Sequence, residues 1–179
     1  MSPSRARCAL PPITLVLGGA RSGKSRHAEQ LVEKTAAAGI YCATAEAGDT
    51  EMAARIAAHR ARRGPFWRTI EAPLDLVDAI AAARPDRPLL VDCLTLWLSN
   101  LFGADRPIEA ESAALAAALR AAAGPVVLVA NEVGMGLVPE TALGRQFRDA
   151  AGRLNQQMAA LADHVVFVVA GLPLVLKGG

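Results

Sequence analysis

A glycine-rich segment near the start of the chain has the residue types and spacing of a phosphate-binding loop. The residues that fit the P-loop pattern G-x-x-x-x-G-K-[ST] are Gly18, Gly19, Ala20, Arg21, Ser22, Gly23, Lys24 and Ser25. Glycines let successive backbone N–H groups face an anionic phosphate, and the amino end of a following helix adds partial positive charge. We expect Lys24 to contact the β- and γ-phosphates and Ser25 to ligate Mg²⁺. The alternative is a glycine-rich turn with an incidental lysine. It does not explain the strand pattern before the motif or the helix pattern after it.

An acidic residue ends another buried strand pattern. Asp92 follows the run Pro-Leu-Leu-Val at 88–91. In a P-loop protein an aspartate in this position holds Mg²⁺, often through water. The alternative is that Asp92 caps a helix predicted to begin near Leu94. Because the P-loop is present, we favour the metal role and predict Ser25 and Asp92 as the metal-binding residues.

The segment 51–63 combines a histidine with several arginines. At about 100° per residue, one helix face would gather Arg55, His59, Arg62 and Arg63 within roughly 100°. Neighbouring cations favour the neutral imidazole, which is the nucleophilic form, and guanidinium groups bind phosphate oxygens. The pattern therefore suggests a nucleophile in an anion-binding pocket. The spacing by itself favours a plainer interpretation, a solvated arginine face near the carboxyl end of a helix.

The charge composition argues against partners that require a broad charged surface. The 179 residues include 19 basic and 17 acidic side chains, a net charge of +2. With arginines clustered on one short helix, this balance disfavours nucleic-acid binding. Only three of the basic residues are lysines, and one of them is Lys24. The length predicts one domain, which we place at residues 13–179 after a short extension, 1–12.

The cysteines and the hydropathy pattern indicate the type of protein. Cys8, Cys42 and Cys93 lack the spacing of a disulfide framework or a zinc site. No run of about 18 apolar residues is present, so we expect no membrane span. Residues 1–12 lack the apolar core of a secretory signal. We therefore expect a cytoplasmic protein.

Short apolar runs alternate with longer amphipathic ones along the chain. We expect strands at 13–17, 40–44, 66–70, 89–92, 126–130, 165–169 and 172–176. We expect helices at 24–38, 51–63, 73–83, 94–102, 108–123 and 139–162. This alternation predicts an α/β fold with a mostly parallel sheet flanked by helices, and the last two strands predict a hairpin at its edge. Ligands bind beyond the carboxyl ends of such strands, where the P-loop, residues 44–48, Asp92 and residues 131–136 would lie.

Six stretches of the sequence resemble those of one enzyme family. They are Leu17–Glu29, Glu51–Arg60, Trp67–Glu71, Val91–Leu101, Asn131–Glu140 and Phe147–Gln156. On these residues the chain resembles the bifunctional adenosylcobinamide kinase / adenosylcobinamide-phosphate guanylyltransferases of cobalamin biosynthesis. The likeness extends over about residues 13–177. The run Asn-Glu-Val-Gly-Met-Gly at 131–136 is more specific than the P-loop, which many unrelated proteins share.

The resemblance implies two reactions in a P-loop NTPase fold of the RecA-like kind. In the first, ATP or GTP phosphorylates the aminopropanol hydroxyl of adenosylcobinamide. In the second, GMP is transferred from GTP to that phosphate through a GMP–histidine intermediate, giving adenosylcobinamide-GDP and pyrophosphate. His59 is the residue that matches the family's nucleophile.

The same resemblance implies the residues of the nucleotide site. Besides the P-loop, they are Ala43, Thr44, Ala45, Arg60, Ala61, Arg62, Arg63, Glu71 and Asp92. His59 and Lys24 are the expected catalytic residues and Mg²⁺ is the expected cofactor. The resemblance also implies a homotrimer. Glu132 could contact substrate or metal, or could belong to a loop whose glycines only make turns.

Two other functions fit the P-loop. A single-activity small-molecule kinase would not form a labelled adduct with α-labelled GTP. A nucleotide-dependent switch or assembly ATPase would hydrolyse nucleotide without depending on a phosphate acceptor.

Overall fold

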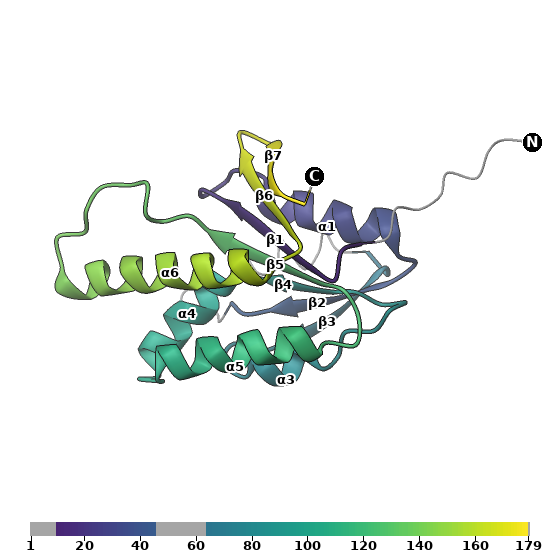
Figure 1. Ribbon diagram of the computed structural model, residues 1–179, viewed down its shortest axis with the longest axis horizontal. Helices are drawn as coiled ribbons and strands as arrows, with labels where there is room; N and C mark the ends of the chain where they lie inside the picture. Colours follow the sequence, from purple (N-terminus) through teal and green to yellow (C-terminus); the bar gives the residue numbers. More distant parts are fainter. Residues whose placement is uncertain (1–9, 46–63, 179) are drawn as a thin grey trace, which may run out of the picture.

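Seven strands form one sheet in the part of the chain that the computed structural model describes, residues 10–45 and 64–178. The strands are β1 (Ile13–Gly18), β2 (Gly39–Ala43), β3 (Trp67–Glu71), β4 (Leu89–Asp92), β5 (Val126–Asn131), β6 (His164–Val169) and β7 (Leu172–Lys177). Their order is β3-β2-β4-β5-β1-β6-β7 (Figure 1). Strands β1 to β6 are parallel to their neighbours, and β7 pairs antiparallel with β6. The predicted fold class, with its C-terminal hairpin at the sheet edge, is confirmed.

Helices cover both faces of this sheet. They are α1 (Lys24–Thr35), α3 (Leu76–Ile80), α4 (Leu94–Gly103), α5 (Ile108–Ala121) and α6 (Ala142–Leu161). Leu15 and Leu17 of β1 belong to the core under α3 to α6, whereas Val16 belongs to the core under α1 (Figure 1). Successive side chains of a strand point to opposite faces. A strand buried on both faces is therefore mostly apolar, and in β1 the one polar side chain is that of the fully buried Thr14.

The parallel register brings the ends of several strands to one edge of the sheet. Gly18 pairs with Asn131, and Ala43 pairs with both Asp92 and Glu71. The residues predicted at strand ends from the sequence therefore meet at the carboxyl edge. This is the edge at which open α/β sheets bind ligands.

Four predicted helices are wrong at their ends: the one predicted at 139–162 begins only at Ala142, after the cap residue Thr141, and the one predicted at 108–123 ends at Ala121. The helix predicted at 24–38 ends at Thr35, whose hydroxyl donates to the carbonyls of Leu31 and Val32. The helix predicted at 73–83 contains only α3 as regular helix, with tighter i to i−3 hydrogen bonds after it. None of the described helices is long and apolar enough to cross a bilayer. The helix predicted at 51–63 lies outside the described residues, and the domain boundary at residue 13 stays a prediction.

Candidate functional site

The predicted P-loop joins the end of β1 to the amino end of α1. Lys24 is the first residue of α1 and only 9% exposed, and its Nζ donates to the carbonyl of Gly19 at 3.2 Å. The ammonium group therefore lies over the loop. Arg21 and Gly23 have φ angles of 56° and 95°. Such left-handed positions in a turn let backbone N–H groups converge on an anion.

The β6–β7 hairpin packs against the P-loop and is hydrogen-bonded to it. The N–H of Gly171, in the hairpin turn, donates to the carbonyl of Ser22 at 2.8 Å. A Cβ at Gly18 would lie 2.6 Å from the carbonyl oxygen of Val168 in β6 and 2.5 Å from Ser22 Oγ. The close approach of these segments explains why residue 18 must be glycine.

Ser25 and Asp92 are brought together as the sequence predicted. Ser25 Oγ donates to Asp92 Oδ1 at 3.1 Å, although 67 residues separate them in the chain. The second carboxylate oxygen, Oδ2, accepts a hydrogen bond from the hydroxyl of Tyr41 on β2. A hydroxyl and a carboxylate are the hard oxygen donors that Mg²⁺ prefers. The pair therefore fits the predicted cation.

Thr44, which follows β2, ties that strand to the turn after β4. The side chain is fully buried, and its Oγ1 accepts from the N–H of Cys93 and donates to the Cys93 carbonyl, both at 2.8 Å. Asn100 of α4 donates to the Thr44 carbonyl at 2.8 Å and to the Pro73 carbonyl at 2.9 Å. These bonds fix the backbone of the predicted segment Ala43-Thr44-Ala45 at the edge of the sheet.

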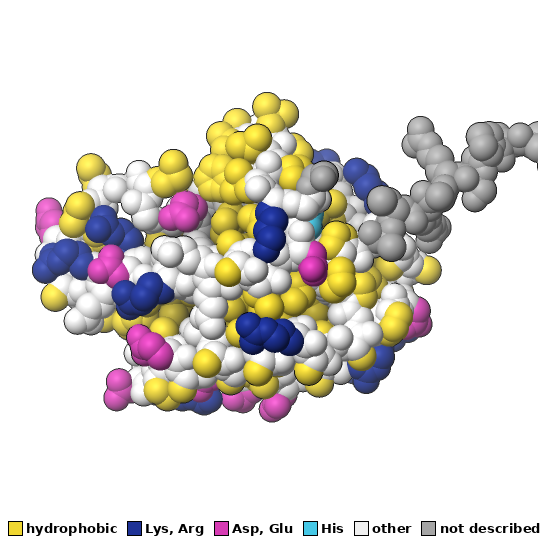
Figure 2. Space-filling view, in the orientation of Figure 1, with side chains coloured by type: hydrophobic (Ala, Val, Ile, Leu, Met, Phe, Trp, Pro, Cys, Tyr) yellow, Lys and Arg dark blue, Asp and Glu magenta, His cyan; other side chains and the backbone are white. Residues whose placement is uncertain are grey.

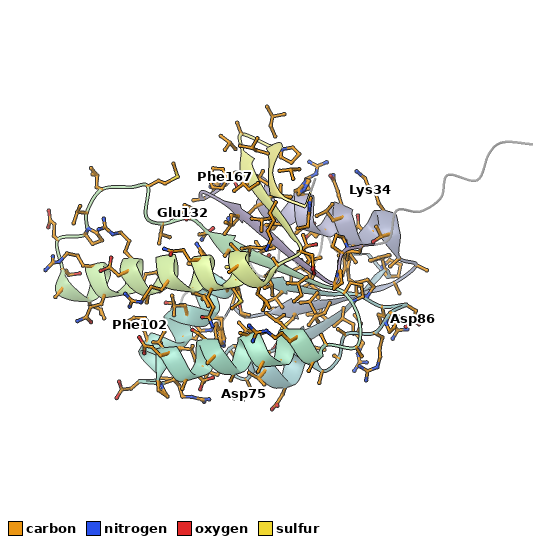
Figure 3. The ribbon with its side chains drawn as sticks, viewed as in Figure 1. Lys34, Asp75, Asp86, Phe102, Glu132 and Phe167 are labelled. Carbon is orange, nitrogen blue, oxygen red and sulfur yellow. The ribbon has the colours of Figure 1, made fainter. Side chains whose placement is uncertain are left out.

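The end of β5 lies directly beside the P-loop. The N–H of Glu132 donates to the Gly18 carbonyl at 3.1 Å, and Glu132 Oε1 accepts from Gly134 N–H at 2.8 Å. Figure 3 shows Glu132 where the chain leaves β5. Thr95 Oγ1 and the amide of Asn155 hold the backbone of Asn131. The structure thus uses the carboxylate of Glu132 to hold its own loop.

The remaining predicted residues fall into two groups. Glu71 is exposed at the end of β3, on the same edge as Asp92 but two strands away. The residues that lie outside the described part of the chain are Arg55, His59, Arg60, Ala61, Arg62 and Arg63.

Sequence reasoning missed three residues that organise this edge: Tyr41, Asn100 and Gly171. Tyr41 carried a usable signal, because a tyrosine in an otherwise apolar strand must find a partner for its hydroxyl. Asn100 and Gly171 carried none, since each acts on a segment far from it in the chain.

Neither described cysteine has the character of a nucleophile. Burial raises the pKa of Cys42 to about 12. Burial first, and then the charge of Asp92, raises the pKa of Cys93 to about 11. Both thiols are therefore protonated at neutral pH, and Cys93 serves the site through its backbone bonds to Thr44.

Comparison with known proteins identifies the family. Residues 14–176 match the family model described as cobinamide kinase / cobinamide phosphate guanyltransferase. The chain belongs to this family of bifunctional enzymes. It is 52% identical over 167 residues to the bifunctional adenosylcobalamin biosynthesis protein CobP of Pseudomonas aeruginosa, covering 92% of this chain and 96% of the relative. It is 45% identical over 179 residues to CobU of Escherichia coli K12, covering 91% and 98%.

Solved structures support the fold of this cobinamide kinase family member. The assembled ATPase EscN of the enteropathogenic E. coli type III secretion system matches with a TM-score of 0.59 and 12% identity. The match covers 91% of this chain and 44% of EscN. At this identity the likeness concerns the fold alone, a P-loop NTPase sheet of the RecA-like kind.

Proposed function

We propose that this protein carries out both reactions of its family. It phosphorylates adenosylcobinamide with ATP or GTP, then transfers GMP from GTP to the resulting phosphate. The family match over residues 14–176 carries the proposal. It favours two activities over the single-activity kinase and over the switch or assembly ATPase. The assembly of Lys24, Ser25 and Asp92 at one sheet edge supports nucleotide binding there.

In the kinase reaction the P-loop holds the triphosphate. Its backbone N–H groups and Lys24 neutralise the β- and γ-phosphates, while the substrate hydroxyl attacks the γ-phosphorus. The bond from this phosphorus to the β,γ-bridging oxygen breaks, the nucleoside diphosphate leaves, and the hydroxyl proton is released. Ser25 and Asp92 would hold Mg²⁺, which supplies further neutralisation of phosphate charge.

In the guanylyl transfer we assign the nucleophile to His59. Its neutral imidazole attacks the α-phosphorus of GTP, and pyrophosphate leaves. A phosphate oxygen of adenosylcobinamide phosphate then attacks the same phosphorus, which releases the imidazole and forms adenosylcobinamide-GDP. Arg60, Arg62 and Arg63 would neutralise the departing pyrophosphate.

Labelling with α-³²P-GTP tests the assignment. Wild-type protein should form an acid-labile GMP adduct, and His59→Ala should lose it while keeping kinase activity. Lys24→Ala should cripple both activities, by about 10²-fold or more for a lost charge contact to the transferring phosphoryl group. The chain has three histidines, so His164→Ala is a matched control that should label normally. An adduct that persists in His59→Ala would refute the assignment.

We further propose that the protein works as a cytoplasmic homotrimer. The family resemblance suggests the trimer. It is supported by the exposed apolar residues of the β6–β7 hairpin, among them Leu172, Leu174 and Leu176. Apolar side chains gathered on a surface are typical of a protein–protein contact.

A further inference from the structure

Tyr41 lies in the sheet strand next to the one that carries Asp92. Strands β2 and β4 pair in parallel, with Tyr41 opposite Leu90 and Ala43 opposite Asp92. The Tyr41 side chain is 3% exposed and belongs to the core under α1, where its ring meets that of Trp67 edge-on at 5.9 Å. From this position its hydroxyl donates to Asp92 Oδ2. The ring is therefore buried in the core, and the hydroxyl at its end is bonded to the carboxylate.

The two oxygens of Asp92 are thereby given different tasks. Oδ2 is held by Tyr41, and Oδ1 receives the hydroxyl proton of Ser25 at 3.1 Å. When Ser25 donates its proton to the carboxylate, the lone pairs of its oxygen remain available to a cation. A hydroxyl donating to a carboxylate makes a charge-assisted bond, which is stronger than a neutral one and resists rotation of the carboxylate plane.

We propose that Tyr41 is a positioning residue for the Mg²⁺–nucleotide complex, because its hydroxyl holds Asp92 in the orientation that receives the Ser25 proton. The proposal rests on the nucleotide site of the proposed function but not on the corrinoid substrate. A tyrosine that merely completes the core would stabilise the fold without changing how the site responds to Mg²⁺. The two roles are therefore separable by measurement.

Tyr41→Phe tests the proposal, because it keeps the ring and removes only the hydroxyl. The measurement is the Kd for α,β-methylene-GTP, an analogue whose α-phosphorus cannot release pyrophosphate, by calorimetry in EDTA and in Mg²⁺. We expect the Kd in EDTA to stay within about twofold and the gain in affinity from Mg²⁺ to fall about tenfold or more, as for one lost bond to a charged group. An unchanged gain from Mg²⁺ in the folded variant would overturn the proposal.

Trp67→Phe is the matched control in the same aromatic cluster. It removes the indole N–H bond to Glu33 Oε1, at 3.0 Å, and leaves the hydroxyl of Tyr41 in place. We expect a lower Tm and a gain from Mg²⁺ equal to that of wild type. If Trp67→Phe changed that gain as much as Tyr41→Phe does, packing and not the hydroxyl would be responsible, and the proposal would fail.

A second measurement does not depend on any variant of Tyr41 folding. Tyr41 is the only tyrosine in the sequence, so growth on 3-fluorotyrosine gives one ¹⁹F resonance. We expect this resonance to shift when Mg²⁺ is added to the protein bound to α,β-methylene-GTP, and the shift to disappear in Asp92→Asn. A ¹⁹F chemical shift that stays the same when Mg²⁺ is added would overturn the proposal. Neither measurement contains a corrinoid, so wild-type protein inactive on adenosylcobinamide would refute the proposed function alone.

Discussion

Two neighbouring regions of the molecule place their side chains in opposite ways. One is the carboxyl edge at β1, β2 and β4, and the other is the β6–β7 hairpin. At the carboxyl edge polar side chains are buried and bonded within the protein: Thr44 donates to the Cys93 carbonyl and Lys24 to the Gly19 carbonyl. On the hairpin apolar side chains face outward, with Leu172 72% and Leu174 58% exposed. Figure 2 shows this apolar surface as the yellow group over β6 and β7.

The difference separates two uses of a sheet edge. Hydrogen bonds within the protein fix the carboxyl edge before any ligand arrives, which is what phosphate recognition requires. The hairpin leaves apolar side chains in contact with water, which does not stabilise a monomer. Such a surface favours contact with a partner protein. The two regions still touch, because the turn at Gly171 bonds to Ser22 of the P-loop. A substitution in the hairpin can therefore alter the conformation of the P-loop, and a substitution in the P-loop can alter the hairpin.

The largest effect should come from filling the space between these regions. In Gly18→Ala the new methyl group would meet the backbone of Val168, and we expect a loss of stability of about 1–3 kcal/mol, as for overpacking. Nothing lies within 4 Å of a Cβ at Gly19, so Gly19→Ala is the matched control. Urea unfolding without nucleotide measures both. Equal urea midpoints for the two variants would contradict the close contact between residue 18 and the hairpin.

The second prediction concerns the apolar surface of the hairpin. Leu174→Asp should dissociate the proposed trimer, because a charge at an apolar contact must lose its water. The unfolding free energy of the isolated subunit should change by no more than about 0.5 kcal/mol, as for exposed sites. Sedimentation measures the first and urea unfolding of dilute protein the second.

Leu137→Asp is the companion variant, since Leu137 is 96% exposed in the loop after β5. It tells whether the trimer depends on the hairpin or on this second apolar segment. A Leu174→Asp protein that still sediments as a trimer would exclude the hairpin as the contact.

The smallest effect should be the pH dependence due to His27 on α1. Burial first, then the charges of Lys34 and His164, lower the pKa of His27 below its ordinary value of 6.5. The unfolded chain therefore binds a proton at a pH where the folded protein does not, and stability rises with pH through the interval just below 6.5. His27→Gln should flatten this rise. Urea midpoints at about pH 5.5 and pH 7.5, either side of the ordinary histidine pKa, measure it. Equal slopes in both proteins would contradict the prediction.

The ends of predicted elements depended on contacts that no local pattern contains. The helix predicted at 73–83 does not begin at Pro73, because the amide of Asn100 and the indole of Trp97 bind the carbonyls of Pro73 and Leu74. Those carbonyls would otherwise accept bonds from the first helical turn. Side chains from α4 thus decide where α3 starts.

The sequence by itself determined the order of strands and helices, the P-loop, and the placement of Asp92 at a strand end. The element order follows from the periodicity of apolar residues, and the P-loop follows from its glycines and Lys24. The position of Asp92 follows because it ends an apolar run, and ligands bind at the carboxyl ends of parallel strands. Tertiary structure alone decided which groups meet at the edge. Tyr41 finds Asp92 across 51 residues and Thr44 finds Cys93 across 49. Such pairs depend on which strands become neighbours and in what register, and only the folded sheet supplies that.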